Sequence, residues 1–148
     1  MAGGLPIAWG AAWGVAWELQ MSEELGGLIS LSFALVLLPG ICIAVTRQAA
    51  EGRVGINGSF GIRTRYTRAS DEAWVAGHRA ALPIVKEMWA VAGVGLAAAV
   101  AVQLAVGGSA GPSVALVALM AEVAVVLRSA AAANRAAKAT GGPVEGRG

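Results

Sequence analysis

The chain has 148 residues, of which 57% are apolar and 14% charged, with a formal net charge of +2 and a mean hydropathy of +0.67. Soluble domains are typically about 45–50% apolar and about 25% charged. Such a low charge content, arranged in long uncharged runs, excludes an ordinary soluble domain and predicts an all-α integral membrane protein.

The first 24 residues contain Trp9, Trp13 and Trp17, at a spacing that puts all three on one face of a helix. Tryptophan concentrates at membrane interfaces, so this segment predicts an extracytoplasmic interfacial helix or a partly disordered stretch. A weak fourth span and a translation start at Met21 are alternatives. The segment lacks the basic region of a signal peptide.

Three transmembrane helices are predicted from the uncharged runs. The first run contains Pro39, where we expect a kink and no end, because proline is tolerated in membrane helices. The second run, from Met88 to Ala121, is too long for one span of ~20 residues. The stretch "GGSAGPS" at 107–113 carries strong turn signals and divides it. The predicted spans are residues 25–46, 84–106 and 113–133.

Seven of the eleven basic residues lie between Arg47 and Glu87, and the other four follow Leu127. Lysine and arginine mark the cytoplasmic side, which predicts a cytoplasmic loop at 47–83, a cytoplasmic C-terminus and an external N-terminus. The tail, residues 135–148, is short, polar and glycine-rich, and we expect it to be disordered.

Small residues recur every four positions in the second span, at Gly93, Ala97, Ala101 and Ala105. Such a stripe lets another helix approach closely. We expect it to pack the chain against itself, with dimerisation as the alternative.

The cytoplasmic loop holds an arginine-rich stretch, "FGIRTRYTRASDEAW". Ser70 precedes two acidic residues, a pattern that predicts the start of a short amphipathic helix within the loop. This helix should run to about Leu82, with Trp74 and His78 on one face and Pro83 opening the next helix.

The loop resembles the signature of the SdpI family of bacterial membrane proteins, although Arg65, Tyr66 and His78 depart from its commonest residues. The resemblance implies a bacterial cytoplasmic membrane protein that confers immunity to a membrane-active peptide toxin. It further implies a peptide or protein partner and signalling through a transcriptional repressor. The matching positions are Asn57, Gly61, Arg63, Thr64, Thr67, Ser70, Trp74 and His78.

Considered without the family, Arg63, Arg65 and Arg68 suit phosphate or carboxylate, including lipid headgroups. They also fit a positive-inside signal. An internal clamp is a third interpretation, in which Arg63 pairs with an acidic residue at the helix start and Thr64 or Thr67 satisfies loop backbone.

Glu122 lies within the third span, where a carboxylate is costly and is a functional candidate. Its expected partners are Gln103 or an arginine such as Arg63, and the alternative is partial solvation near the inner interface. His78 is either a packing residue or a proton carrier.

The sequence carries no enzyme signature and no metal-ligand spacing, so we expect no catalysis, metal or cofactor. Nucleic-acid binding is disfavoured because the arginines lie against a membrane. Besides toxin immunity, two functions stay open: an accessory subunit of a larger membrane complex, and a lipid or anion binder or transporter.

Overall fold

The structure, a computed structural model, describes residues 7–140, and most side chains before Glu23 lie outside that description. Four helices make up the described part, which has no strand: α1 (Ile7–Ala50), α2 (Asp71–Lys86), α3 (Met88–Val106) and α4 (Ala110–Ala139). Three segments are long and apolar enough to cross a membrane: Glu23–Ala50, Asp71–Val106 and Ala110–Ala139. The prediction of an all-helical chain with three such segments is confirmed.

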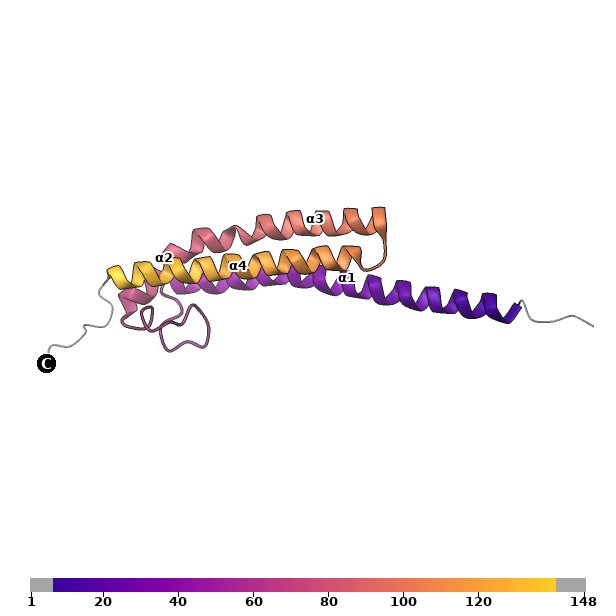
Figure 1. Cartoon of the computed structure of the whole chain (residues 1–148). Coiled ribbons are helices and arrows are strands. Elements are labelled where there is room, and N and C mark those ends of the chain that lie inside the picture. The colour runs from indigo at the N-terminus through magenta and orange to yellow at the C-terminus, as the bar shows by residue number, and fades with distance from the viewer. Residues whose placement is uncertain (1–6, 141–148) are drawn as a thin grey trace, which may run out of the picture.

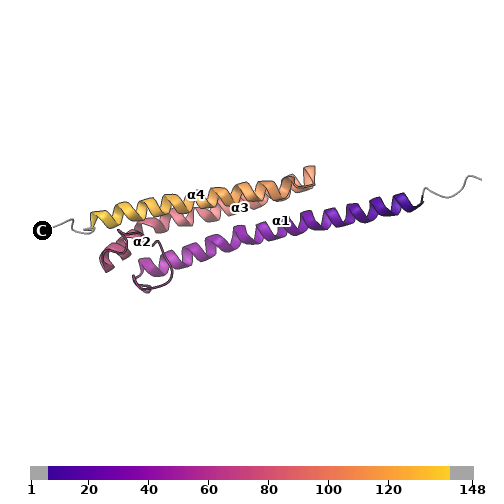
Figure 2. The same cartoon turned by 60° about the horizontal axis from the view of Figure 1, so that its bottom comes forward.

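Helix α4 runs alongside the other helices and contacts all three of them (Figure 1). Helices α2 and α3 follow one another along one side of α4, and α1 runs along another. Both views show α1 extending past the α3–α4 turn (Figure 2). The irregular loop, residues 51–70, lies at the opposite end, where α1 and α4 finish.

Helix α1 is longer than its predicted span and has no boundary between the Trp-rich segment and that span. It is continuous from Ile7 through the fully buried Pro39 to Ala50. At ~1.5 Å per residue, 44 residues extend about 66 Å, roughly twice the hydrocarbon thickness of a bilayer. The alternative of a partly disordered stretch is therefore wrong from Ile7 onward, and the interfacial location of this segment stays a prediction. The three tryptophan side chains lie outside the described residues.

The start of α2 agrees with the sequence. Ser70 is extended and its hydroxyl accepts a hydrogen bond from the Ala73 N–H, as expected of an N-cap. The predicted end is wrong, because α2 continues through Pro83 and the break falls at Glu87. Pro83 is exposed, so its ring points away from the packed face.

The face of α3 that packs on α4 also differs from the predicted one. Gly93, Ala97, Ala101 and Ala105 are all exposed, whereas Ala92, Gly95 and Ala99 are buried. A Cβ added to Gly95 would lie 2.3 Å from the Cβ of Ala118, so glycine is needed for this close approach. Small residues occur on every side of α3, and their spacing alone could not select the face.

The third span and the tail need a smaller correction. Gly111 and Pro112 lie in the first turn of α4 and not in the turn that precedes it. At the other end, residues 135–139 continue α4, although we expected them to be disordered. This last stretch stays helical because Ala133 and Ala137 are fully buried. Residues 141–148 of the predicted tail lie outside the described residues.

Candidate functional site

The 51–70 loop is fastened to α2 by Trp74. Its side chain is fully buried, and its indole N–H donates a hydrogen bond to the Val54 carbonyl at 2.7 Å. The indole also lies against the His78 imidazole one turn later, with 4.3 Å between ring centroids. The Trp74 side chain therefore holds the first part of the loop and packs against His78, the next residue that anchors the loop.

His78 is that next anchor, and both of its ring nitrogens are used. Nε2 accepts a hydrogen bond from the Ile62 N–H at 2.9 Å, while Nδ1 lies 2.8 Å from the Trp74 carbonyl. Because Nε2 accepts, the ring is neutral and the proton is on Nδ1, which donates to Trp74. A proton on Nε2 would face the Ile62 N–H directly. In this fold His78 is therefore a structural hydrogen-bonding residue.

Gly61 is the loop residue that passes close to both of these rings. Its φ of +118° is a conformation that residues with a Cβ rarely adopt. An added Cβ would lie 2.9 Å from His78 Nε2 and 2.9 Å from the Trp74 ring. Both the backbone and the available space therefore require glycine here.

Two threonine side chains form hydrogen bonds with backbone groups of the loop. Thr67 is fully buried, and its hydroxyl donates to the Ile62 carbonyl at 2.6 Å and accepts from the Thr64 N–H at 2.9 Å. The Thr64 hydroxyl donates to the Asn134 Oδ1 on α4 and accepts from the Thr67 N–H at 3.2 Å. These bonds connect the loop to α4 and leave its buried polar groups partnered.

Asn134 was missed by the sequence analysis, which expected a disordered tail to begin at the next residue. Nothing local marks it as a partner of Thr64, which lies 70 residues earlier. Gly77 was missed as well. An added Cβ at Gly77 would lie 3.0 Å from Thr67 Cγ2 and 3.1 Å from the Ala133 carbonyl, so a small residue lets α2 meet both the loop and α4.

We call this arrangement the loop clamp. It consists of Gly61, Thr64, Thr67, Trp74, His78 and Asn134.

A protein-family model described as the SdpI/YfhL protein family matches residues 53–128, just over half of the 148 residues. The chain belongs to the SdpI/YfhL family. No curated protein and no solved structure was found to match it. The family match covers the loop, α2, α3 and most of α4, and it ends before Asn134, so the SdpI segment is anchored partly by a residue outside it.

Three of the arginines in the SdpI segment, those of the stretch "RTRYTR", have no role in the clamp. Arg63, Arg65 and Arg68 are all exposed. Arg63 donates to the Gly58 carbonyl, and Arg65 lies 5.1 Å from the centroid of the Tyr66 ring. None of them forms an ion pair with a described residue, so the expected pairs of Arg63 with Asp71, Glu72 or Glu122 are wrong.

Tyr66 has a second cation close to its ring. Lys138 on α4 lies 4.3 Å from the ring centroid. The contact of Lys138 with Tyr66 joins α4 to the loop, in addition to the hydrogen bond between Thr64 and Asn134. Asn57 is exposed and forms no side-chain hydrogen bond with a described residue.

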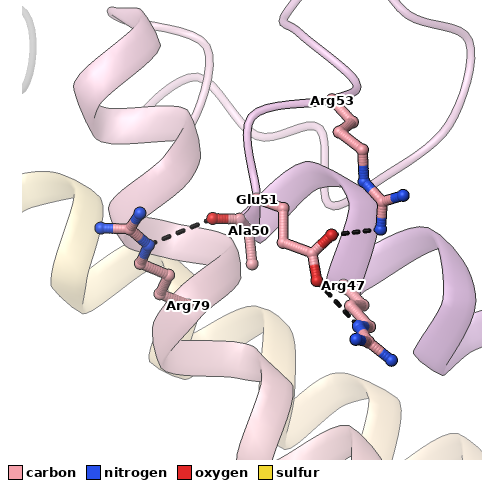
Figure 3. A network of polar contacts seen from close by, with 5 residues as sticks. All are labelled: Arg47, Ala50, Glu51, Arg53 and Arg79. Atoms are coloured by element: carbon pink, nitrogen blue, oxygen red, sulfur yellow. Dashed lines mark hydrogen bonds and ion pairs between the residues drawn. The ribbon is translucent and has the colours of Figure 1, made fainter.

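Other arginines serve the end of α1, where the last carbonyls of a helix lack intrahelical donors. Arg79 Nε donates to the Ala50 carbonyl at 3.1 Å, and Glu51 lies between Arg47 and Arg53 (Figure 3). The hydrogen bond from Arg47, assisted by Arg53, lowers the pKa of the Glu51 carboxyl from its ordinary value. These cations are also exposed, but Arg47 and Arg53 form ion pairs with Glu51, whereas Arg63, Arg65 and Arg68 form none with a described residue.

The two intramembrane polar candidates do not meet. Gln103 Oε1 accepts a hydrogen bond from the Gly111 N–H at 3.1 Å and so fixes the α3–α4 turn. Glu122 is fully buried, and neither of its carboxyl oxygens has a hydrogen-bond partner. The expected Glu122 partners are therefore wrong, and so is the alternative of partial solvation. No three His, Cys, Asp or Glu side chains among residues 7–140 gather as metal ligands.

Proposed function

We propose that this protein is an immunity protein of the SdpI type, which protects a bacterial membrane against a membrane-active peptide toxin by binding a peptide or protein partner. Family membership carries the proposal, together with the content of the matched segment. That segment includes a loop that the clamp anchors to α2 and α4 and that carries exposed arginines. We place the loop and the C-terminus in the cytoplasm, because the basic residues gather at that end.

The loop clamp divides the segment into two classes of residue. Trp74, His78 and Thr67 are buried and their polar atoms are used within the fold, so they are unsuited to bind a partner directly. Arg63, Arg65 and Arg68 are exposed, and beside them Phe60 has 66% of its surface exposed. We therefore assign the contact with the partner to the arginines and the positioning of the loop to the clamp.

Guanidinium groups favour carboxylates and phosphates, because their planar forks donate two parallel hydrogen bonds. The partner that suits this surface is an acidic protein or peptide segment. Signalling fits the same surface, since a cytoplasmic transcriptional repressor with an acidic face would be drawn to the membrane. A lipid headgroup offers the same chemistry, and the experiment must separate the two sources.

The test is protection of toxin-sensitive bacteria that express the full chain. Replacing Arg63, Arg65 and Arg68 together by Gln should reduce survival to that of cells without the protein. The same three changes to Lys keep the charge and hence the orientation, so a loss there too would identify the fork geometry as the requirement. As a matched control, Arg47→Gln with Arg53→Gln removes arginines that are engaged by Glu51, and protection should remain.

Full protection by the triple Gln variant would overturn the assignment to the arginines. Copurification distinguishes a protein or peptide ligand from a lipid headgroup. A stoichiometric acidic protein lost in the triple variant supports a protein partner, whereas salt-sensitive binding to anionic vesicles alone supports a lipid ligand.

An accessory role in a larger membrane complex is the second candidate. Gly93, Ala97, Ala101 and Ala105 form an exposed small-residue face that the bundle does not use. Such faces allow close helix contact in membranes. Purification from native membranes decides: a stoichiometric integral membrane partner lost on Ala97→Leu supports this role, and a chain that purifies alone counts against it.

A further inference from the structure

Glu122 occupies a core position of α4. The buried residues of this helix recur every three or four positions, so they form one continuous stripe facing the other helices. Glu122 lies in that stripe between two apolar clusters. One contains Leu28, Leu35, Ala99, Ala115 and Ala118, and the other contains Val85, Met88 and Val125. The carboxyl thus lies where a small or apolar side chain would be expected.

The environment of this carboxyl offers it no compensation. Its side chain is 0% exposed, and both oxygens lack a hydrogen-bond partner. An isolated ionised carboxylate in such surroundings is strongly destabilising, and buried groups of this kind usually take up a proton instead. A neutral carboxyl retains a smaller cost, because its polar atoms are still unpaired.

The charged and titratable groups of the neighbouring helices do not supply a counter-ion. Helix α1 contributes Cys42, a half-buried free thiol that carries no positive charge. Helix α3 has no ionisable residue from Met88 to Val106. On α2, the imidazole of His78 is held by Ile62 and Trp74, and Lys86 is exposed at the end of the helix.

The nearest cation on α4 itself is already paired. Arg128 is six residues from Glu122, about 9 Å along the helix, and it is exposed. Its guanidinium forms an ion pair with Glu87 at 3.1 Å, at the junction of α2 and α3. Within the described chain, a proton is the remaining positive charge that can neutralise Glu122.

We propose that Glu122 is an intramembrane proton-binding site. Its carboxyl holds a proton while α1, α2, α3 and α4 are packed as in this structure, and it releases the proton when water reaches the layer between the two apolar clusters. The site makes the packing of the bundle sensitive to proton concentration. This assignment is independent of the immunity function, since it rests on burial and on the absence of a partner.

Infrared spectroscopy of the full chain in lipid vesicles tests the protonation directly. We expect a protonated-carboxyl C=O band at neutral pH that is lost in Glu122→Gln and kept in Glu87→Gln, whose carboxyl is exposed. Raising the pH should remove the band, with the protonated fraction falling about tenfold per pH unit above the midpoint. If Glu122→Gln does not accumulate, Glu122→Leu serves as the reference without the carboxyl.

Chemical labelling gives a second readout on the same vesicles. The apolar reagent dicyclohexylcarbodiimide adds to a protonated carboxyl: the acid proton moves to a reagent nitrogen, and a new C–O bond forms without a leaving group. The adduct should appear on the peptide that contains Glu122 and fade at alkaline pH. A water-soluble carbodiimide should instead label Glu87.

Two results would overturn the proposal. The first is a wild-type spectrum that lacks the protonated-carboxyl band at neutral pH, because Glu122 would then be ionised. The second is a band that stays unchanged across the pH range over which the bundle remains folded, because the proton would then be permanent and the site would not exchange it.

Discussion

The two polar regions of this protein are built in opposite ways. In the loop clamp, the buried side-chain polar atoms of Thr67, Trp74 and His78 are hydrogen-bonded within the fold. In the middle of the bundle, Glu122 is as deeply buried and has no partner. A network in which every polar atom is hydrogen-bonded holds one geometry. The charge of an unpaired carboxyl depends instead on its surroundings. The clamp is therefore suited to positioning and Glu122 to responding.

The largest expected effect on stability comes from removing the Trp74 side chain of the loop clamp. Trp74→Ala removes a fully buried indole together with its bond to Val54, and should destabilise the protein by about 3–5 kcal/mol. Unfolding in detergent, followed by temperature or denaturant, measures this. Trp74→Phe keeps most of the ring and loses the N–H, so it should cost clearly less. Equal losses would mean that packing contributes little.

Gly61→Ala tests whether the loop clamp requires a residue without a Cβ at this position. A Cβ would meet both His78 and Trp74 at a positive φ, and we expect a loss of about 2–3 kcal/mol. Gly55→Ala is the matched control in the same loop, since a Cβ there would meet nothing within 4 Å and its φ is not in the left-handed region. Similar thermal midpoints for the two variants would contradict the described loop path.

Thr67→Val isolates the hydrogen bonds, because it preserves the shape of the side chain. The Ile62 carbonyl and the Thr64 N–H would lose the hydroxyl, for an expected cost of about 1–2 kcal/mol. Thr140→Val, which removes an exposed hydroxyl, should leave the free energy of unfolding almost unchanged. Amide hydrogen exchange at residue 64 provides a local readout that a general loss of stability would not single out.

Glu122→Leu is expected to have the opposite sign. Replacing an unpaired carboxyl by an apolar side chain of similar size should stabilise the bundle by about 1 kcal/mol. Glu122→Gln keeps unpaired polar atoms in the same place and should bring no gain. Destabilisation by Leu would show that the carboxyl has a partner in the membrane-embedded protein.

The smallest effect is expected at the exposed end of α1. The pKa of Glu51 is lowered by Arg47, so its contribution to stability is present above the ordinary carboxyl pKa and is lost as the pH falls through the lowered value. Glu51→Gln should remove this slight acid sensitivity, and added salt should weaken it in the wild type. A pH profile of unfolding for both chains checks the sign.

Much of the framework could be predicted from local patterns. Uncharged runs predict the three apolar helices, since crossing hydrocarbon requires length and low polarity. Ser70 and the two acids after it predict the start of α2, because a cap acts on the backbone within three residues. The spacing of Trp74 and His78 places them on one face for the same local reason. These features depend on neighbours in the sequence.

The errors share a different origin. In α3 the small residues lie on all sides, and the contact of Gly95 with Ala118 selects the packed face. Pairing Glu122 with Gln103 or Arg63 was reasonable by charge and polarity, but Gln103 is taken by Gly111 and Arg63 points outward. The helical continuation of α4 past Asn134 depends on its contacts with α2 and the loop.

The sequence by itself determined that this is a multi-pass helical membrane protein with an arginine-rich loop, because hydropathy, capping and positive charge act through near neighbours. The tertiary structure decided which polar groups are satisfied and which are left over. Partners such as Thr64 and Asn134 are 70 residues apart in the chain, and the two apolar clusters that flank Glu122 along α4 draw their side chains from several helices. Hydrogen bonds act over about 3 Å, so such partners are fixed only once the helices have packed.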